Sequence, residues 1–378
     1  MRVKLGEVCK VVSGTTPKSS CPEYWNGTLN WVTPAELKDD SDIVYETERK
    51  ITLRAVQDTG LKPFPIGTVL LSSRAPIGKV AISGTEMYCN QGFKNLVCSG
   101  SIYNRYLYHF LKDKTEYLNA LGRGATFKEI SKDIVENIEI PLPPLETQRH
   151  IAAVLDKVSA LIALRRQQLD KLDELVKARF VEMFGDPVKS TRWRMRKLSQ
   201  MGELNRGVSK HRPRNDPALL GGRYPLIQTG DVANAGLFIS SFSSTYSELG
   251  LKQSRMWQAG TLCITIAANI AKTAILSFDA CFPDSIVGFI PSEEISVVFI
   301  HYWFSFFQKI LEEQAPQVAQ KNINLQILSN LDVIVPPADL QNQFAAFVTQ
   351  TEKTKVAVQQ ALEKLETLKK ALMQEYYG

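Results

Sequence analysis

The chain repeats itself at a constant offset of 193 residues. The Pro-Pro pair at Pro143 recurs at Pro336, and residues 143–185 resemble residues 336–378 over their whole length. The same offset relates identical residues along the entire chain: Gly14 and Gly207, Gly67 and Gly260, Lys79 and Lys272, Ile130 and Ile323, Gln148 and Gln341, Leu172 and Leu365, and Gly185 and Gly378. A register held over that distance indicates one structural unit used twice, each copy ending in the same way.

Length and composition are those of an ordinary globular protein. The 378 residues suffice for two or three domains, each with its own core. No apolar run reaches the roughly 18 residues needed to cross a bilayer, and the first residues lack the apolar centre of a signal peptide. The six cysteines lack the paired spacing of a zinc site, so we expect reduced, buried thiols and a cytoplasmic protein.

Each half has the pattern of short strands and helices before its Pro-Pro pair. In the first half, residues 67–83 have a strand–loop–strand pattern, and a short helix is expected around residues 102–111. The second half keeps this order, with residues 260–277 and a helix over 298–313. Such a mixture predicts an α+β fold with two similar α/β domains rather than a doubly wound sheet.

Each Pro-Pro pair ends a strand and begins a long helix. The first helix is expected from Leu145 to Phe184, which is 40 residues or about 60 Å. Its apolar residues alternate at spacings of four and three, as in a coiled coil, and Arg165 and Arg179 interrupt them. The predicted seam comprises Ile151, Leu155, Val158, Ile162, Leu169, Leu172 and Val176 in the first helix, and Val358, Leu362, Leu365 and Leu372 in the second.

A helix with such a seam needs a partner, and the other long helix can provide it. If a pseudo-twofold axis relates the two halves, the helices pack antiparallel and the domains lie at opposite ends. The predicted architecture is therefore two similar domains separated by a long antiparallel two-helix coiled coil, with a pseudo-twofold internal repeat. The alternatives are that each helix folds back on its own domain, or that it serves only to bind another subunit.

Positive charge is concentrated just after the first long helix. Between Lys189 and Arg214 there are nine basic residues and one acidic residue, Glu203, whereas the whole chain has a net charge of +6. Such a local excess is typical of a surface that binds a polyanion, and the alternative is a solvated linker. In residues 192–196 (RWRMR), a strand would place the arginines on one face and direct Trp193 and Met195 toward the core.

Two similar domains separated by a rigid pair of long helices could each bind one half-site of a duplex DNA target. Identical pairs such as Lys79/Lys272 are expected at phosphates or in the shared scaffold, whereas Arg74/Ala267 and Gln91/Asp284 differ and are expected where different bases are recognised. For any one lysine, a solvated surface charge is the alternative. The candidate DNA-binding residues are Lys18, Arg74, Lys79, Gln91, Lys94, Lys128, Arg192, Arg194, Arg196, Lys210, Arg212, Arg214, Lys272 and Lys321.

The chain resembles the specificity (S) subunit of type I restriction–modification systems over its full length. The resemblance lies in residues 3–17 (VKLGEVCKVVSGTTP), 67–82, 90–96 (NQGFKNL) and, most strongly, from 140–162 through to 178–187. Residues 260–272 lack the arginine that the family usually carries in that loop. The resemblance implies target-recognition domains at 1–143 and 188–336, a central conserved helix at 144–187 and a C-terminal conserved helix at 337–378.

The resemblance also implies the partners. These are double-stranded DNA read as a bipartite target, two modification (methyltransferase) subunits docked on the coiled coil, and motor-nuclease restriction subunits, with no membrane. S-adenosylmethionine would then belong to the methyltransferase subunits, and ATP and magnesium to the restriction subunits. We expect no cofactor and no metal on this chain.

The sequence lacks the motifs of the chemistry that such a complex performs. Neither Pro-Pro pair follows an asparagine as in adenine methylation, no Walker A motif is present, and the four histidines are scattered. We therefore expect a binding subunit rather than an enzyme. Two alternatives are a coiled-coil adaptor without a nucleic-acid role, which the basic run disfavours, and an enzyme whose site is assembled from both halves.

Overall fold

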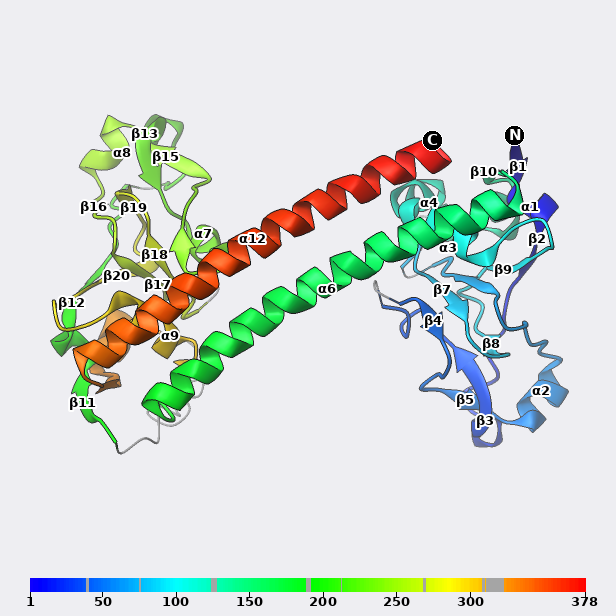
Figure 1. The fold of residues 1–378 in the computed structure, drawn as a ribbon, viewed down its shortest axis with the longest axis horizontal. Coiled ribbons are helices and arrows are strands. Elements are labelled where there is room, and N and C mark those ends of the chain that lie inside the picture. Colours follow the sequence, from blue (N-terminus) through cyan, green and yellow to red (C-terminus); the bar gives the residue numbers. More distant parts are fainter. Residues whose placement is uncertain are drawn as a thin grey trace. The chain divides into compact units, whose positions relative to one another are not determined.

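The chain folds into two units that share two long helices (Figure 1). The computed structural model describes residues 1–378 except 39–40, 75, 124–127, 188–191, 212, 268–269, 308–309 and 311–322. Unit 1 comprises Met1–Arg166 with Gln360–Gly378, and unit 2 comprises Gln167–Gln359. Helix α6 (Leu145–Phe184) begins in unit 1 and ends in unit 2, and α12 (Ala338–Tyr377) does the reverse.

Unit 1 is built from short strands and helices that precede α6. Its strands are β1 (Arg2–Lys4), β2 (Cys9–Val12), β3 (Trp25–Val32), β4 (Ile43–Val44), β5 (Lys50–Ile51), β6 (Val69–Leu71), β7 (Val80–Ser83), β8 (Tyr88–Cys89), β9 (Asn95–Cys98) and β10 (Glu139–Pro141). Its shorter helices are α1 (Leu5–Val8), the 3-10 helix η1 (Pro22–Tyr24), α2 (Leu53–Thr59), α3 (Asn104–Asp113), α4 (Thr115–Leu121) and α5 (Lys132–Glu136).

Unit 2 repeats this order before α12. Its strands are β11 (Arg194–Lys197), β12 (Gly202–Arg206), β13 (Leu220–Leu226), β14 (Phe238–Ile239), β15 (Ser244–Tyr246), β16 (Met256–Trp257), β17 (Leu262–Thr265), β18 (Thr273–Leu276), β19 (Ala280–Cys281), β20 (Ile286–Pro291) and β21 (Asp332–Val335). Its shorter helices are the 3-10 helices η2 (Leu198–Gln200) and η3 (Pro217–Leu219), and α7 (Thr229–Asn234), α8 (Glu248–Lys252), α9 (Val297–Phe304) and α11 (Leu325–Asn330).

The two units have the same sheet topology. The five-stranded sheet β2-β9-β6-β7-β4 of unit 1 corresponds strand by strand to β12-β20-β17-β18-β14 of unit 2. The sheet β5-β3-β8 corresponds to β15-β13-β19, to which unit 2 adds β16, and the pair β1-β10 corresponds to β11-β21. The register is repeated as well, since Val69 lies opposite Ile82 and Leu262 lies opposite Ile275. The predicted duplication and the α+β fold class are confirmed.

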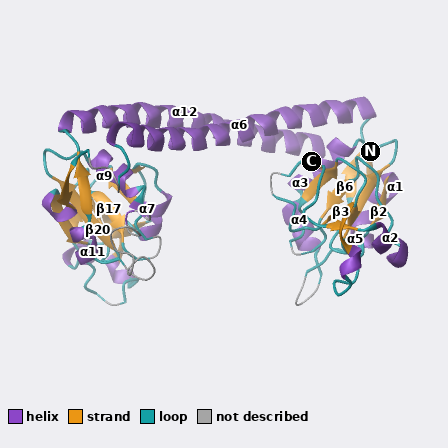
Figure 2. Cartoon of the chain, turned by 90° about the horizontal axis from the view of Figure 1, so that it is seen from below, coloured by secondary structure: helices purple, strands orange, loops and turns teal. Residues whose placement is uncertain are grey.

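The five-stranded sheet of each unit is buried on both faces. In β6, Val69 and Leu71 face the core cluster that includes α3, whereas Leu70 between them faces the cluster under β3. In β17, Leu262 and Cys263 divide in the same way between two clusters. A strand covered on both sides carries apolar residues at consecutive positions, which explains the unbroken apolar runs of these segments. In Figure 2, α3 and α9 lie between the strands of their own unit and the long helices.

The repeated glycines occupy positions where a side chain would either clash with the backbone or strain it. A Cβ atom on Gly14 would lie 1.8 Å from the Cys89 carbonyl oxygen, and one on Gly207 would lie 2.3 Å from that of Pro283. Gly67 and Gly260 adopt left-handed φ angles of 83° and 87°, which favour glycine. The sequence repeat at these positions therefore reflects identical backbone constraints in both units.

A repeated glutamine attaches each long helix to its unit. Gln148 accepts a hydrogen bond from the Tyr103 backbone N–H (2.8 Å), which is the residue that precedes α3. Gln341 accepts one from the Ser296 N–H (2.9 Å) before α9. Both glutamines are fully buried and donate to the carbonyl oxygen of the first proline of the Pro-Pro pair. Each amide satisfies a free N–H at a helix start, so the long helix and the short helix are held together.

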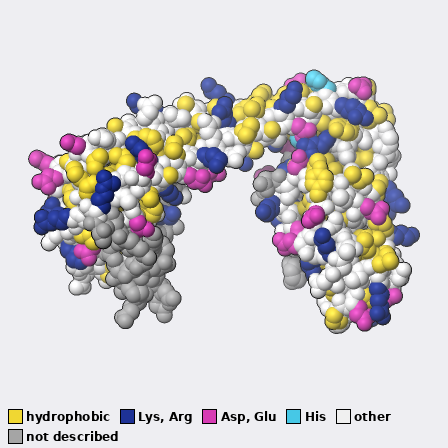
Figure 3. All heavy atoms as spheres, turned by 60° about the horizontal axis from the view of Figure 1, so that its bottom comes forward, with side chains coloured by type: hydrophobic (Ala, Val, Ile, Leu, Met, Phe, Trp, Pro, Cys, Tyr) yellow, Lys and Arg dark blue, Asp and Glu magenta, His cyan; other side chains and the backbone are white. Residues whose placement is uncertain are grey.

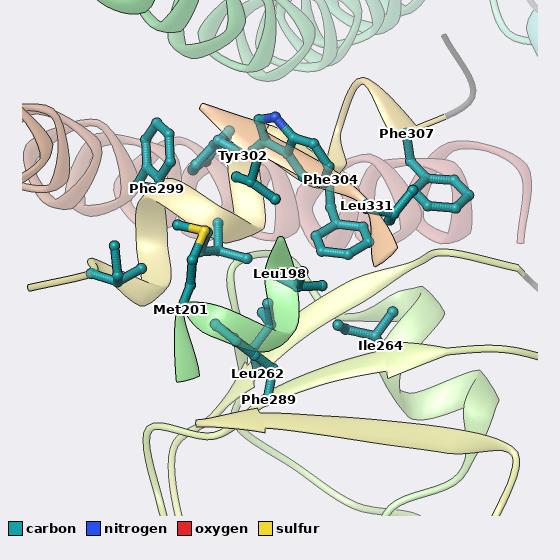
Figure 4. Packing of buried hydrophobic residues seen from close by; sticks show 14 of the residues in the cluster. Leu198, Met201, Leu262, Ile264, Phe289, Phe299, Tyr302, Phe304, Phe307 and Leu331 are labelled. Carbon is teal, nitrogen blue, oxygen red and sulfur yellow. The ribbon is translucent and has the colours of Figure 1, made fainter. Parts of the chain in front are cut away.

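Beyond this shared contact, the long helices pack on the two units by different chemistry. In unit 2, the Phe180 ring lies 4.9–5.5 Å from those of Phe184, Phe299, Phe306 and Phe344. These rings belong to a large apolar core, part of which is seen in Figure 4, where Leu198 and Met201 lie between α9 and the sheet. Aromatic pairs at this spacing add favourable contacts beyond burial alone.

In unit 1 the corresponding contact is partly ionic. Asp156 on α6 accepts hydrogen bonds from Arg105 (2.6 Å) and lies 2.7 Å from His109 Nε2, both on α3. Burial raises the Asp156 pKa, but the bonds from His109 and Arg105 outweigh it and leave the pKa below its usual value. Burial lowers the pKa of His109, so this imidazole is neutral near pH 7.

Within each unit the long helices run antiparallel. In unit 1, Ile151 near the start of α6 shares a core with Tyr377 near the end of α12, and further along Arg166 pairs with Glu366 (2.7 Å). In unit 2, Asp173 pairs with Lys355 (2.7 Å), and Phe180 packs against Phe344. Higher numbers in α6 therefore meet lower numbers in α12. The predicted seam residues are buried at Ile151, Leu155, Val158, Ile162, Val176, Val358 and Leu362, and half-buried at Leu169, Leu172, Leu365 and Leu372.

One predicted side-chain orientation is wrong, and one predicted helix lies partly outside the described residues. Met195, expected to face the core, is 39% exposed, because β11 is paired only with β21 and lies at the edge of the unit. Trp193 does pack against the core and donates to the Phe184 carbonyl oxygen (2.8 Å). The helix predicted over 298–313 is seen from Val297 to Phe304, and most of its remainder lies outside the described residues.

Candidate nucleic-acid interface

Six of the candidate residues lie in one region of unit 1. We define the unit 1 loop cluster as residues 13–18, 72–79, 90–94 and 128–130, of which residue 75 is outside the described part. Backbone hydrogen bonds join these loops, since Ser73 N–H donates to the Gly92 carbonyl (2.8 Å) and Ile130 N–H to the Ser73 carbonyl (3.0 Å). Thr16 donates to the side-chain oxygen of Gln91, which connects the first loop to the third.

The basic side chains of the unit 1 loop cluster differ in their exposure to solvent and in the partners that they already contact. Lys94 is buried and bonds Glu129 (3.0 Å), and the Lys79 ammonium donates to the Leu37 carbonyl oxygen. Arg74 is 35% exposed and lies 3.9 Å from the same Glu129. Lys18 and Lys128 are exposed. Lys94 and Lys79 thus stabilise the loops, whereas Arg74, Lys18 and Lys128 present charge to solvent.

Unit 2 builds the same frame from the repeated segments. We define the unit 2 loop cluster as residues 206–216, 265–272 and 283–286, of which 212 and 268–269 are outside the described part. Ile266 N–H donates to the Ser285 carbonyl (3.0 Å), which is the repeat equivalent of the bond between Ser73 and Gly92. The Thr265 side chain accepts from Lys272 N–H (3.0 Å), as the Ser72 side chain accepts from Lys79 N–H (2.8 Å).

The side chains on this frame are not the same as in unit 1. Position 284 is an aspartate that pairs with Arg214, where unit 1 has Gln91. Arg206 donates to the Asp284 carbonyl oxygen. Lys272 and Lys210 are exposed, so Lys272 differs from its counterpart Lys79, whose ammonium is bound inside the unit. Two of the candidates, Arg212 and Lys321, lie outside the described residues.

Several described residues of the basic run that follows α6 are paired with acidic side chains. Arg196 lies 3.8 Å from Glu294 and Lys197 2.8 Å from Asp332, while Arg214 pairs with Asp284 in the unit 2 loop cluster. Arg194 is exposed, and Arg192 lies over the Trp193 ring at 4.5 Å. Figure 3 likewise shows basic and acidic side chains interspersed over the visible face. Three residues of the run, Arg196, Lys197 and Arg214, are thus paired with acidic residues that come from distant parts of the chain.

The described part of the chain was also compared with the requirements of a metal site and of a membrane-spanning helix. Across the residues placed by the structure, no three His, Cys, Asp or Glu side chains come close enough to hold a metal ion. The same part of the chain contains no helix with the length and apolarity required to traverse a lipid bilayer. All six cysteines are free thiols, and burial raises the pKa of Cys263.

These features define a class of protein: a duplicated binding protein with two similar mixed domains on a pair of long helices, each carrying a loop cluster on the same backbone frame. Comparison with known proteins agrees. The family described as the type I restriction modification DNA specificity domain matches residues 1–174 and 191–367. The chain therefore belongs to this family, and it is a specificity subunit that recognises DNA sequence and is not itself a catalyst.

Individual relatives support this assignment over the full length. The MjaIX specificity subunit of Methanocaldococcus jannaschii is 28% identical over 371 residues, covering 91% of this chain and 85% of that protein. The MjaVIII specificity subunit of the same organism is 23% identical, covering 98% and 90%. Among solved structures, the S subunit from M. genitalium has a TM-score of 0.58 with 15% identity and covers all of this chain and 96% of that one. A structure of a type I system has a TM-score of 0.61 with 19% identity, covering 100% and 97%.

Sequence reasoning missed several residues that the structure places in the two loop clusters. Asp284 was named only because it differs from its counterpart Gln91, and its pairing with an arginine was not foreseen. Glu129, Thr16 and Arg206 were not among the candidate residues. Glu129 directly follows the candidate Lys128, and Arg206 lies in the basic run, so charge alone carried some signal. Their roles depend on partners far away in sequence, such as Lys94 for Glu129 and Asp284 for Arg206, which no local pattern reveals.

Proposed function

We propose that the chain reads a bipartite DNA target, with each loop cluster contacting one half-site, and that methyltransferase subunits dock on α6 and α12. The observation that carries this proposal is a backbone frame that is repeated in both loop clusters while the side chains on it differ. Both loop clusters use the same backbone bonds, but Arg74 and Gln91 in unit 1 are replaced by Ala267 and Asp284 in unit 2. A constant frame holds the backbone of the DNA in a similar way, while different side chains select different bases.

The long helices support a separation of the half-sites. Each is 40 residues long, or about 60 Å, and each begins in one unit and ends in the other. Paired helices resist bending because their seam is packed, so they suit a fixed spacer between two recognised sequences. Half-sites one helical turn apart are separated by about 34–36 Å, which is within reach of such a spacer.

The principal test is DNA binding by the chain in complex with its methyltransferase partner. A gel-shift titration over several salt concentrations is expected to show affinity that falls steeply with salt, because cations leave the DNA on binding. Methylome sequencing of cells that carry the intact system is expected to give one gapped sequence with two different half-sites. Salt-independent binding, or a single continuous target, would contradict the proposal.

The spacer role has its own test. Residues 165–171 and their repeat counterparts 358–364 form one heptad in each helix. Deleting both keeps the seam in phase and shortens the pair by roughly 10 Å, equivalent to about 3 base pairs. The methylome of this variant should show a shorter gap with both half-sites unchanged. Altered half-site bases with an unchanged gap would refute the spacer role.

Docking of two partner copies is supported by a pair of exposed leucines. Leu175 and Leu368 occupy equivalent positions in the repeat, and they are 49% and 46% exposed. Apolar residues that recur at equivalent surface positions suit two copies of one partner, since each copy can then make the same contact. The exposed Leu161 has Thr354 as its counterpart and cannot form such a pair.

Native mass spectrometry of the complex tests this assignment. Leu175→Ser and Leu368→Ser should each cause the loss of one methyltransferase copy, and the double variant should lose both. Leu161→Ala is the matched control and should keep two copies. An unchanged stoichiometry in the double variant would place the docking surface elsewhere.

A further inference from the structure

Unit 2 has Ala267 where unit 1 has Arg74, yet another arginine of its loop cluster, Arg214, is bound beside the corresponding loop. Arg74 directly follows Ser73, whose N–H bonds the carbonyl of Gly92, the residue after Gln91. In unit 2, Ala267 follows Ile266, whose N–H bonds the carbonyl of Ser285, the residue after Asp284. Asp284 thus stands beside the loop of Ala267, and the Arg214 guanidinium is bound to its carboxylate.

The loop that carries Arg214 is braced at both ends. At its start, the side-chain oxygen of Gln253 accepts hydrogen bonds from Lys210 N–H (2.7 Å) and His211 N–H (3.0 Å). At its end, one oxygen of Asp216 accepts from Ala218 N–H (2.9 Å) and the other lies 3.1 Å from His211 Nε2. The hydrogen bond from the Ala218 N–H, followed by that from His211, lowers the pKa of Asp216, so this carboxylate remains charged near neutral pH. A braced loop presents its arginine in a restricted position, which reduces the entropy lost on binding.

The exposure of the pair suits a contact with an external ligand. Arg214 is 46% exposed, whereas Asp284 is 27% exposed, so the acid lies deeper and the arginine lies outside it. A guanidinium has five N–H donors in a planar fork, and a carboxylate engages only some of them. The remaining donors match the O6 and N7 acceptors of guanine in the major groove, which is the commonest specific arginine contact with DNA.

We propose that Arg214, held by Asp284, recognises a guanine in the half-site of unit 2. Arg214 would then have in unit 2 the role that Arg74 has in unit 1. The inference rests on the bipartite DNA recognition proposed above. Asp284 positions the arginine and neutralises part of its charge, which makes the pair a reader of base edges rather than a general phosphate contact. The two units therefore present an arginine from different loops of one frame.

The test compares sequence selection by purified complexes of the chain with its methyltransferase partner. Each complex selects DNA from a pool in which both half-sites are randomised, and the bound fraction is sequenced. Arg214→Ala should reduce the preference for guanine at one position of the unit 2 half-site by about 5- to 150-fold. Preferences at the unit 1 half-site should not change.

Two conservative variants separate positioning from charge. Arg214→Lys keeps the positive charge but cannot fork onto two acceptors, so it should lose most of the guanine preference. Asp284→Asn keeps the arginine but weakens its anchor, so the loss should be smaller than for Arg214→Ala. Arg223→Ala is the matched control, because it removes another exposed arginine of unit 2 that pairs with a carboxylate, Glu248. The control should change no preference by more than about twofold.

Several outcomes would overturn the inference. The inference fails if Arg214→Ala leaves guanine selected as before, or weakens binding equally on all sequences with a smaller salt slope, as a phosphate contact would. It also fails if both half-sites lose their preferences together, since that indicates damage to the fold, which a thermal melt would reveal. If the wild-type complex selects no sequence, the proposed function itself fails; if wild type and Arg214→Ala select the same two half-sites, only this inference does.

Discussion

We predict that unit 2 loses stability in mild acid because of one histidine. His301 on α9 has its Nδ1 atom 3.0 Å from the Thr273 hydroxyl on β18, and burial together with the charge of Lys355 lowers its pKa to about 4. Its usual value is about 6.5. As the pH falls below 6.5, the unfolded chain takes up a proton at this position while the folded chain does not. The free energy of unfolding therefore falls between pH 6.5 and pH 4.

The size of this effect follows from the two pKa values. With 6.5 in the unfolded state and about 4 in the folded state, the loss at pH 5 relative to pH 8 is about 2 kcal/mol. His301 is only half-buried by its accessible surface, which makes this an upper value. His301→Asn keeps an amide near the Thr273 hydroxyl but does not titrate, so it should remove this part of the acid sensitivity.

Urea unfolding at pH 8 and pH 5, followed by tryptophan fluorescence, measures the effect. Replacing Trp25 and Trp31 of unit 1 by phenylalanine leaves the three tryptophans of unit 2 as the probe. His150→Asn, on the exposed surface of α6 in unit 1, is the control and should behave like wild type. The reasoning is refuted if His301→Asn loses as much stability between pH 8 and pH 5 as the wild-type protein.

Three further predictions concern packing, backbone strain and charge. Phe180→Ala should lower the free energy of unfolding of unit 2 by about 3–5 kcal/mol in urea titrations, because a fully buried ring is lost. The control Val181→Ala removes a side chain that is 41% exposed and should cost well under 1 kcal/mol. Equal losses in the two variants would contradict the packing argument. Ala271→Gly should stabilise unit 2 by about 1 kcal/mol in a thermal melt, since Ala271 has a left-handed φ of 58°, and destabilisation would count against strain there. Lys272→Ala should reduce the salt slope of DNA binding by about one, because this exposed lysine is free to contact a phosphate. Lys79→Ala should leave the slope unchanged, because its ammonium is bound to the Leu37 carbonyl oxygen. The reverse result would show that Lys79, and not Lys272, contacts the DNA.

Much of the fold could be predicted because it depends on local patterns. The Pro-Pro pairs and the four–three spacing predicted α6 from Leu145 to Phe184, which is its observed range. The repeated glycines marked positions that the backbone itself requires, at Gly14 and Gly67 and at their counterparts. These features follow from steric limits and helix periodicity, which act on neighbours in sequence, so a sequence repeat necessarily becomes a structural repeat.

The candidate interface was predicted less completely because its residues act through distant partners. The sequence named Lys79 and Lys94 as candidates, but it did not show that a carbonyl oxygen and Glu129 already engage them. The basic run after α6 was visible in the sequence, but the pairing of three of its residues with Glu294, Asp332 and Asp284 was not.

The amino-acid sequence by itself determined that this protein is a duplicated molecule, with two α+β units and two 40-residue helices, because those properties are encoded in spacing along the chain. Only the tertiary structure decided which charges are available to a ligand. Arg214 and Asp284 are 70 residues apart and meet because two loops rest on one sheet. The availability of a charge depends on the groups that folding brings within a few ångströms of it, and those groups come from anywhere in the sequence.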